Sequence, residues 1–279
     1  MKLPHSRRAV SAGRYCAPAA LLLTLVACNP EQPVQATSMN PRADVILAAP
    51  NLQGGTDHFM CYEAIEDDAG TSVTISLTDQ WQTLSNVQAA NILEFCNPAE
   101  KTFNTVTTPI AEENAHLAFY ELTQKLPSIQ KRVTIRNQLS ANDQVLRVAA
   151  PKFVGVPTVK NGVGDLGTVE RELSHFTCYE ASGKRLLAPV TLSDQFFQSK
   201  EALVHAPQYF CLPAEKTRGT EVTPEARAED HLVCYKVTPS EEPGEAVTSP
   251  SIENQFETDV LKIGPLHYLC VPSEKVSFT

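Results

Sequence analysis

The feature that most constrains the fold of this chain is a tandem repeat. Four times a histidine stands four residues before a tyrosine, and successive pairs are 58, 59 and 56 residues apart. Each pair is followed by a glutamine and then by Pro-x-x-Lys. The pairs are His58/Tyr62, His116/Tyr120, His175/Tyr179 and His231/Tyr235. Because self-similarity at a fixed period indicates equivalent structural units, residues 57–276 are predicted to form four related repeats.

The first 28 residues are typical of an export signal. Four basic residues precede an apolar core at 17–27, which is too short to cross a membrane. The core ends in Leu25-Val26-Ala27-Cys28, which resembles the lipobox of bacterial lipoproteins. That resemblance implies cleavage before Cys28 and lipid attachment to it. An ordinary cleaved signal and twin-arginine export through Arg7-Arg8 are the alternatives.

Charge excludes one class of partner. Removal of residues 1–27, which carry four basic residues and no acidic one, changes the formal net charge from −9 to −13. Such a surface repels phosphate backbones and anionic lipids, so nucleic acid is not expected as a partner and the lipid must hold the protein on its membrane. Residues 28–49 are rich in proline and poor in large apolar residues, which predicts an extended tether.

Six cysteines stand one at each end of three repeats, with spacings of 35, 33 and 36 residues. Because equivalent units should close in equivalent ways, they predict one disulfide per repeat in an exported protein. The pairs are Cys61–Cys96, Cys178–Cys211 and Cys234–Cys270. Zinc binding is the alternative, but the chain lacks C-x-x-C. The second repeat has Phe119 and Gly155 at the two cysteine positions, which predicts that these residues are neighbours.

Local patterns predict β-structure throughout. Apolar residues alternate over 73–78, and the pattern recurs at 133–135 and 190–192. In each opening strand the cysteine position shares the core face, while the repeated histidine and tyrosine take the other face and are expected at the surface. Each closing strand should end at its proline. A short helix fits residues 82–93.

The predicted fold is all-β, with four tandem repeats of about 57 residues, each of which is too small to be stable alone. We expect two β-sandwich or barrel-like domains at 50–160 and 168–279, joined by a glycine-rich linker at 161–167. A closed four-bladed ring is the alternative. The linker contains Gly162-x-Gly164-x-x-Gly167, but no βαβ unit surrounds this dinucleotide-binding pattern, so no cofactor is predicted.

The repeated histidines are the strongest candidates for chemistry, because four imidazoles could converge on a metal in a closed ring. A catalytic group is needed only once, however, whereas a residue present in every repeat serves each repeat. We therefore predict structural roles for His58, His116, His175 and His231, and neither a metal site nor catalytic residues. The chain also lacks H-E-x-x-H, G-x-S-x-G and the phosphate-binding G-x-x-x-x-G-K.

Three motifs of the third repeat carry a family resemblance. The H-x-x-C-Y opening at 175–179, V-T-L-S-D-Q-F at 190–196 and C-x-P-x-E-K at 211–216 resemble repeats of exported bacterial and archaeal proteins whose function is uncharacterised. The resemblance extends over nearly all of residues 57–276. It implies an extracytoplasmic, cysteine-stapled β module and brings no assigned activity.

Together these features predict a lipid-anchored, non-catalytic protein of the bacterial cell envelope. It is expected to be extracytoplasmic, and at the outer membrane if the organism has one. Its repeats would bind or scaffold another envelope protein or a glycan. One alternative is an envelope hydrolase or carbohydrate-active enzyme with its site in the divergent second repeat. The other is metal capture by the repeated histidines.

Overall fold

A computed structural model describes residues 55–66, 72–240 and 248–279, which belong to one compact unit. The signal sequence, Cys28 and the tether lie outside the described residues. Strands are the main secondary structure of the described part, which has one short helix, and the all-β class is confirmed. The elements are β1 (His58–Glu66), β2 (Val73–Asp79), β3 (Thr83–Phe103), β4 (Val106–Thr108), β5 (His116–Leu122), β6 (Lys131–Arg136), β7 (Gln144–Lys160), α1 (Leu166–Glu172), β8 (His175–Ser182), β9 (Ala188–Ser193), β10 (Lys200–Arg218), β11 (Glu221–Thr223), β12 (His231–Pro239), β13 (Ser251–Asn254) and β14 (Thr258–Phe278). In this part of the chain no helix is long and apolar enough to cross a bilayer.

The alternating segments form strands as predicted, but residues 82–93 do not form a helix. They belong to β3, which pairs with β2 on one side and β5 on the other. Asn86 and Asn91 have positive φ angles of 52° and 50°, and the register shifts beside each of them. These two bulges break the period of two along β3, so the apolar spacing resembles that of a helix.

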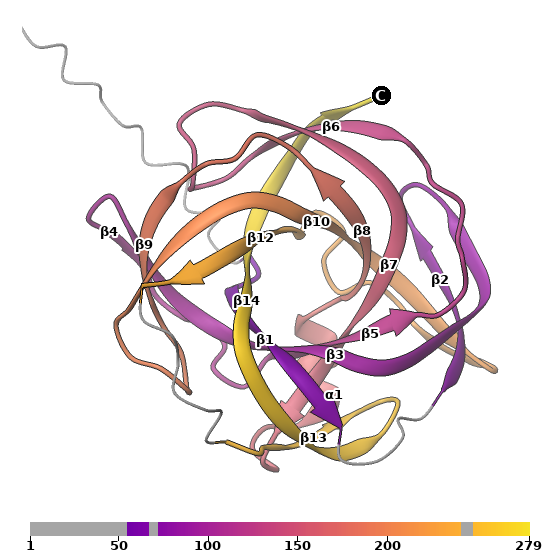
Figure 1. The fold of residues 1–279 in the computed structure, drawn as a ribbon. Helices are drawn as coiled ribbons and strands as arrows, with labels where there is room; N and C mark the ends of the chain where they lie inside the picture. Colours follow the sequence, from indigo (N-terminus) through magenta and orange to yellow (C-terminus); the bar gives the residue numbers. More distant parts are fainter. Residues whose placement is uncertain (1–54, 67–71, 241–247) are drawn as a thin grey trace, which may run out of the picture. The chain divides into compact units, whose positions relative to one another are not determined.

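Eight strands form a closed circuit of antiparallel pairs. The order is β1, β3, β5, β7, β8, β10, β12 and β14, and β14 pairs again with β1. Each repeat contributes its opening strand and its closing strand, so the first and last repeats meet where β1 and β14 pair (Figure 1). Every strand of the circuit is thus paired on both sides, which leaves no open edge among the eight.

The shorter strands are shared between opposite repeats. β2 lies between β3 of its own repeat and β10 of the third, and β9 lies between β10 and β3. In the same way β6 joins β7 to β14, and β13 joins β14 to β7. The long closing strands therefore pair within the circuit over one part of their length and with the opposite repeat over another.

The closing strands do not end at their prolines, contrary to the prediction. In β3, the last pair with β5 is at Cys96 and the first pair with β9 is at Glu100, so Pro98 lies between the two partners. The same holds for Pro157, Pro213 and Pro272. A proline has no backbone N–H to donate. Each of these prolines lies at the point where one edge of the strand changes partner, so no neighbouring strand is left without a hydrogen bond there.

The two expected domains are not separate. β13 of the fourth repeat pairs with β7 of the second. β1, the first strand of the first repeat, pairs with β14, the last strand of the fourth. Of the two predicted arrangements, the closed one describes the pairing, although the repeats share strands and do not form independent blades. The physical reason is that two separate halves would leave strand edges unpaired, whereas closure satisfies them.

The predicted linker at 161–167 is a turn followed by the start of α1. Gly162 and Gly164 have φ angles of +64° and +100°, which favour glycine, and the side chain of Asp165 accepts a hydrogen bond from the Thr168 backbone at the first turn. Val169 of this helix packs in the same apolar cluster as the six cysteines. The linker therefore connects two adjacent strands of one sheet, β7 and β8.

Both faces of the circuit are buried. On one face an inner cluster contains all six cysteines, together with Phe59, Leu117, Phe176 and Leu232. On the other, an outer cluster contains the four repeated tyrosines and is covered by the shared strands. The three predicted within-repeat disulfides are present. Phe119 and Gly155 are paired directly across β5 and β7, as the second repeat predicted.

Candidate functional site

The four repeated histidines are buried, so the prediction that they occupy surface positions is wrong. His58, His116, His175 and His231 are 3%, 1%, 0% and 1% exposed. They point to the face that the sequence assigned to solvent, but the shared strands cover this face. Burial lowers the pKa of all four, to about 3 for His116 and about 4 for His231. The imidazoles are therefore neutral at physiological pH.

A lysine lies close to each repeated histidine and comes from the Pro-x-x-Lys motif of the same repeat. Its positive charge lowers the pKa of the histidine further, after burial. The pairs are His58/Lys101, His116/Lys160, His175/Lys216 and His231/Lys275. Burial also lowers the pKa of Lys101, Lys160 and Lys216 to about 8. The two motifs are thus brought together inside each repeat.

These lysines also connect one repeat to the next. Lys101 donates to Oε1 of Gln138 at 2.6 Å. Lys160 lies 4.4 Å from the ring centroid of Phe196, and Lys216 lies 5.4 Å from that of Phe256. In each case the partner belongs to the glutamine-containing motif of the following repeat. Buried cations therefore hold successive repeats together through hydrogen bonds and cation–π contacts.

The repeated tyrosines connect opposite repeats. The Tyr62 hydroxyl donates to Oδ2 of Asp194 at 2.9 Å, and the Tyr179 hydroxyl donates to Asp79 at 2.6 Å. In the other two repeats the direction is reversed, because Asn254 donates to Tyr120 and Asn137 donates to Tyr235, both at 2.8 Å. The alternation of acid and amide along the chain thus follows the pairing of the first repeat with the third and of the second with the fourth.

The repeated residues connect parts of this protein to one another. Each histidine lies near the lysine of its own repeat, whose charge disfavours the protonated imidazole, and the four do not form one common site. Among the residues that the structure describes, no group of three or more His, Cys, Asp or Glu side chains is arranged to hold a metal ion. The positions of the histidines therefore do not favour the alternative of metal capture.

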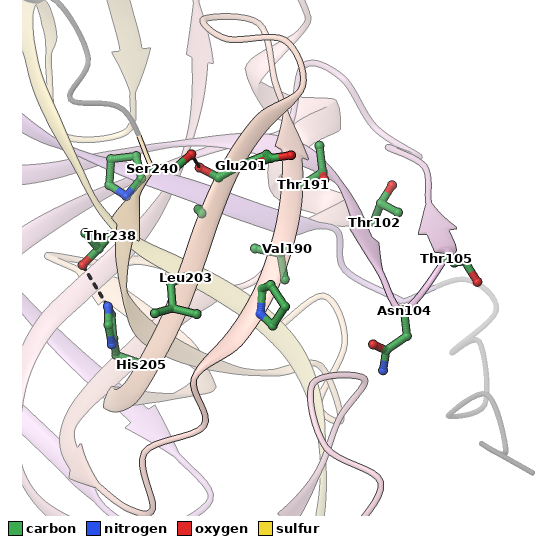
Figure 2. A pocket seen from close by; sticks show the side chains of 13 residues that line it. Thr102, Asn104, Thr105, Val190, Thr191, Glu201, Leu203, His205, Thr238 and Ser240 are labelled. Carbon is green, nitrogen blue, oxygen red and sulfur yellow. Dashed lines mark hydrogen bonds between the residues drawn. The ribbon is translucent and has the colours of Figure 1, made fainter. Parts of the chain in front are cut away.

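A groove of about 610 Å³ lies over β3, β9, β10 and β12, away from the repeated histidines, tyrosines and lysines (Figure 2). It is lined by Thr102, Asn104, Thr105, Pro189, Val190, Thr191, Glu201, Ala202, Leu203, His205, Thr238, Pro239 and Ser240. The neighbouring strands pair in this order, β3 with β9, β9 with β10 and β10 with β12. The groove is therefore a surface built by the first, third and fourth repeats, and both hydroxyl-bearing and apolar residues line it.

His205 is a lining residue whose ring lies within hydrogen-bond distance of a side-chain hydroxyl. Its Nε2 lies 2.8 Å from Oγ1 of Thr238 (Figure 2). Nη2 of Arg185 lies 2.9 Å from its Nδ1. Because a guanidinium can only donate, Nδ1 must accept, and the proton of the neutral ring is on Nε2. Nε2 then donates to Thr238 and cannot take a proton from it. A nucleophile activated by a base requires the opposite arrangement.

Two smaller grooves, of about 370 and 350 Å³, adjoin the first and share Thr238 with it. None of the three is lined by a residue of the second repeat. Sequence reasoning missed these surfaces because it followed the repeated positions. The signal that could have revealed them is the presence of two histidines outside the repeat register within 57–276. His205 lines two of the grooves, and His267 lines the third.

The model of one protein family, a repeat of unknown function (DUF7450), matches residues 123–271, just over half of the chain. The chain belongs to this repeat family. Its membership agrees with the resemblance to an uncharacterised repeat family that the motifs indicated. No curated protein and no solved structure matches the chain.

Proposed function

We propose that this member of the DUF7450 repeat family is a lipid-anchored protein of the bacterial cell envelope whose repeats form a non-catalytic binding or scaffolding module. The export signal and Cys28 support the anchor. Three disulfides suit an oxidising, extracytoplasmic compartment. The groove over β3, β9, β10 and β12 is the proposed docking surface for another envelope component.

The observation that carries the non-catalytic role is the contact of Arg185 with Nδ1 of His205, from which the proton position on the ring follows. Arg185 holds Nδ1 as an acceptor, so Nε2 donates to Thr238 and leaves this hydroxyl without a base. The groove instead offers side-chain hydroxyls and amides from Thr102, Asn104 and Thr191. Such groups are suited to hydrogen-bonding an extended polar partner, and a protein or a glycan of the envelope could supply one.

Site-specific photo-cross-linking in intact cells tests the docking surface. A photoreactive residue at Thr191, inside the groove, is expected to give one discrete adduct. The matched control is Thr134, the equivalent position on β6, which lines none of the three grooves. Equal adducts at both positions, or none at Thr191, would contradict the proposed surface.

Fractionation tests the anchor separately. We expect the wild-type protein in the membrane fraction and the Cys28→Ser variant either in the soluble extracytoplasmic fraction or retained as an uncleaved precursor, because the modified cysteine directs processing. Metabolic labelling with a fatty-acid analogue should mark the wild-type chain alone. Labelling of the variant would count against lipid attachment at Cys28.

A further inference from the structure

The groove of about 350 Å³ differs chemically from the rest of this acidic protein. It is lined by Arg185, His205, Ala206, Gln208, Lys236 and Thr238. Two of these six residues carry a permanent positive charge and none carries a carboxylate, whereas the whole chain has a formal net charge of −9. A concentration of positive charge in a pocket with hydrogen-bond donors favours an anionic ligand.

Arg185 is held in place before any ligand binds. It lies between β8 and β9, and the backbone N–H of the next residue, Leu186, donates to the carbonyl of His205 at 3.3 Å. Its Nε and Nη2 atoms lie 3.3 and 2.9 Å from Nδ1 of His205. These contacts use one edge of the guanidinium, and the N–H groups of Nη1 stay available for an acceptor. A pre-oriented guanidinium loses less entropy when it binds an oxyanion.

Lys236 supplies the second charge from a different strand. It is exposed on β12, directly opposite Tyr268 of β14, and lines both smaller grooves. Its charge and that of Arg185 both lower the pKa of His205, after the effect of partial burial, so the two cations act on the same pocket. In the described part of the chain, no carboxylate lies within ion-pair distance of either side chain.

From this geometry we propose that the pocket is a binding site for a phosphate monoester. Two positive charges match the roughly −1.5 to −2 charge of such a group, and its three terminal oxygens suit the guanidinium, the ammonium and the hydroxyl of Thr238, which accepts from His205 and keeps its own proton to donate. The groove volume of about 350 Å³ leaves room for an organic group attached to the phosphate. The site goes beyond the proposed docking role, because it would bind a small anion with or without an envelope partner.

Isothermal titration calorimetry of the folded, disulfide-bonded chain tests the site with three probes: glucose 1-phosphate, inorganic phosphate and glucose. We expect both phosphates to bind, more weakly as the salt concentration rises, and glucose to give no binding heat. Tighter binding of glucose 1-phosphate than of inorganic phosphate would assign the site to an ester. Equal affinities would assign it to the phosphate ion itself.

Charge variants locate the binding. Arg185→Gln and Lys236→Gln should each weaken phosphate binding about tenfold, as expected for the loss of one charged hydrogen bond. Lys184→Gln removes the same charge one residue away and outside the lining, so it should leave the affinity unchanged. The ring resonances of His205 should shift during the titration. Absence of phosphate binding, or an equal loss in the Lys184→Gln variant, would overturn the proposal.

Discussion

Single residues of the second repeat show how a missing disulfide is replaced. Phe119 stands opposite Gly155 in the same register that joins Cys61 to Cys96 in the first repeat. A Cβ atom added to Gly155 would lie 2.9 Å from Cε1 of Phe119 and 3.4 Å from Cβ of Phe176. The ring therefore fills the space that a second side chain would occupy, and the glycine is needed for its volume.

Gly155→Ala should consequently destabilise the protein by about 1–3 kcal/mol through overpacking. Urea unfolding followed by fluorescence measures this loss. The double variant Phe119→Leu/Gly155→Ala should recover part of it, because the smaller side chain makes room for the methyl group. A double variant less stable than Gly155→Ala alone would show that the cost has another cause.

A second residue-scale prediction concerns the disulfides. Sγ of Cys61 lies 3.5 Å from Sγ of Cys270, although the two atoms belong to different bridges. In Cys96→Ser the freed Cys61 thiolate should attack Cys270, forming a Cys61–Cys270 bond and releasing Cys234 as a thiolate. Peptide mapping without reductant, after incubation at mildly alkaline pH, should detect this new link.

The matched control is Cys211→Ser. Among the described residues, no hydrogen-bond contact joins Sγ of Cys178 to a sulfur atom of another bridge, so Cys178 should stay a free thiol in that variant. An intact Cys234–Cys270 bond in Cys96→Ser, with Cys61 still free, would mean that this proximity does not lead to exchange.

At the scale of elements, the shared strands explain why opposite repeats match each other. β2 and β9 join the first and third repeats, and β6 and β13 join the second and fourth. Each shared strand leads directly into the acid or amide that meets a tyrosine of the opposite repeat. The strand pairing between opposite repeats therefore places the acid or amide beside the tyrosine with which it forms a hydrogen bond.

Replacement by asparagine should destabilise the protein more at Asp194 than at Asp79. Oδ2 of Asp194 accepts hydrogen bonds from both Tyr62 and Asn97, so an amide nitrogen in its place would face the Asn97 donor. Oδ2 of Asp79 accepts from the Tyr179 hydroxyl, which can rotate to accept instead. Asp194→Asn should thus cost about 1–3 kcal/mol and Asp79→Asn less, measured by denaturant unfolding. Equal costs would contradict the assigned donors.

The whole molecule contains four buried neutral histidines, which couple its stability to pH. Burial lowers their pKa below the value of 6.5, so the unfolded chain binds protons that the folded chain does not. The histidine contribution to stability is therefore complete above pH 6.5 and is lost as the pH falls. Burial raises the pKa of Asp79 and Asp194, and these acids oppose the loss at lower pH.

A variant isolates one histidine from the others. Between pH 6.5 and about 3, wild-type stability should fall more steeply than that of His116→Gln, by about 1.4 kcal/mol per pH unit, the energy of one proton. Urea unfolding across this range measures both slopes. His267→Gln should leave the slope below pH 6.5 unchanged and alter it only above pH 6.5, where wild-type stability falls as the pH rises through the pKa of His267, which the hydrogen bond to Glu94 raises. Identical slopes for wild type and His116→Gln would show that the histidine is protonated in the folded state.

The sequence alone determined the four repeats, their β-structure, the three disulfides and the contact between Phe119 and Gly155. These follow from period and spacing, which are properties of the chain. Only the tertiary structure decided that the circuit closes, that opposite repeats share strands and that the histidines are buried. Those outcomes depend on which strand edges meet and on what covers the second face, and hydrogen bonds between distant residues decide both. The grooves around His205 belong to the same class, because they join side chains of three repeats that no single repeat pattern connects.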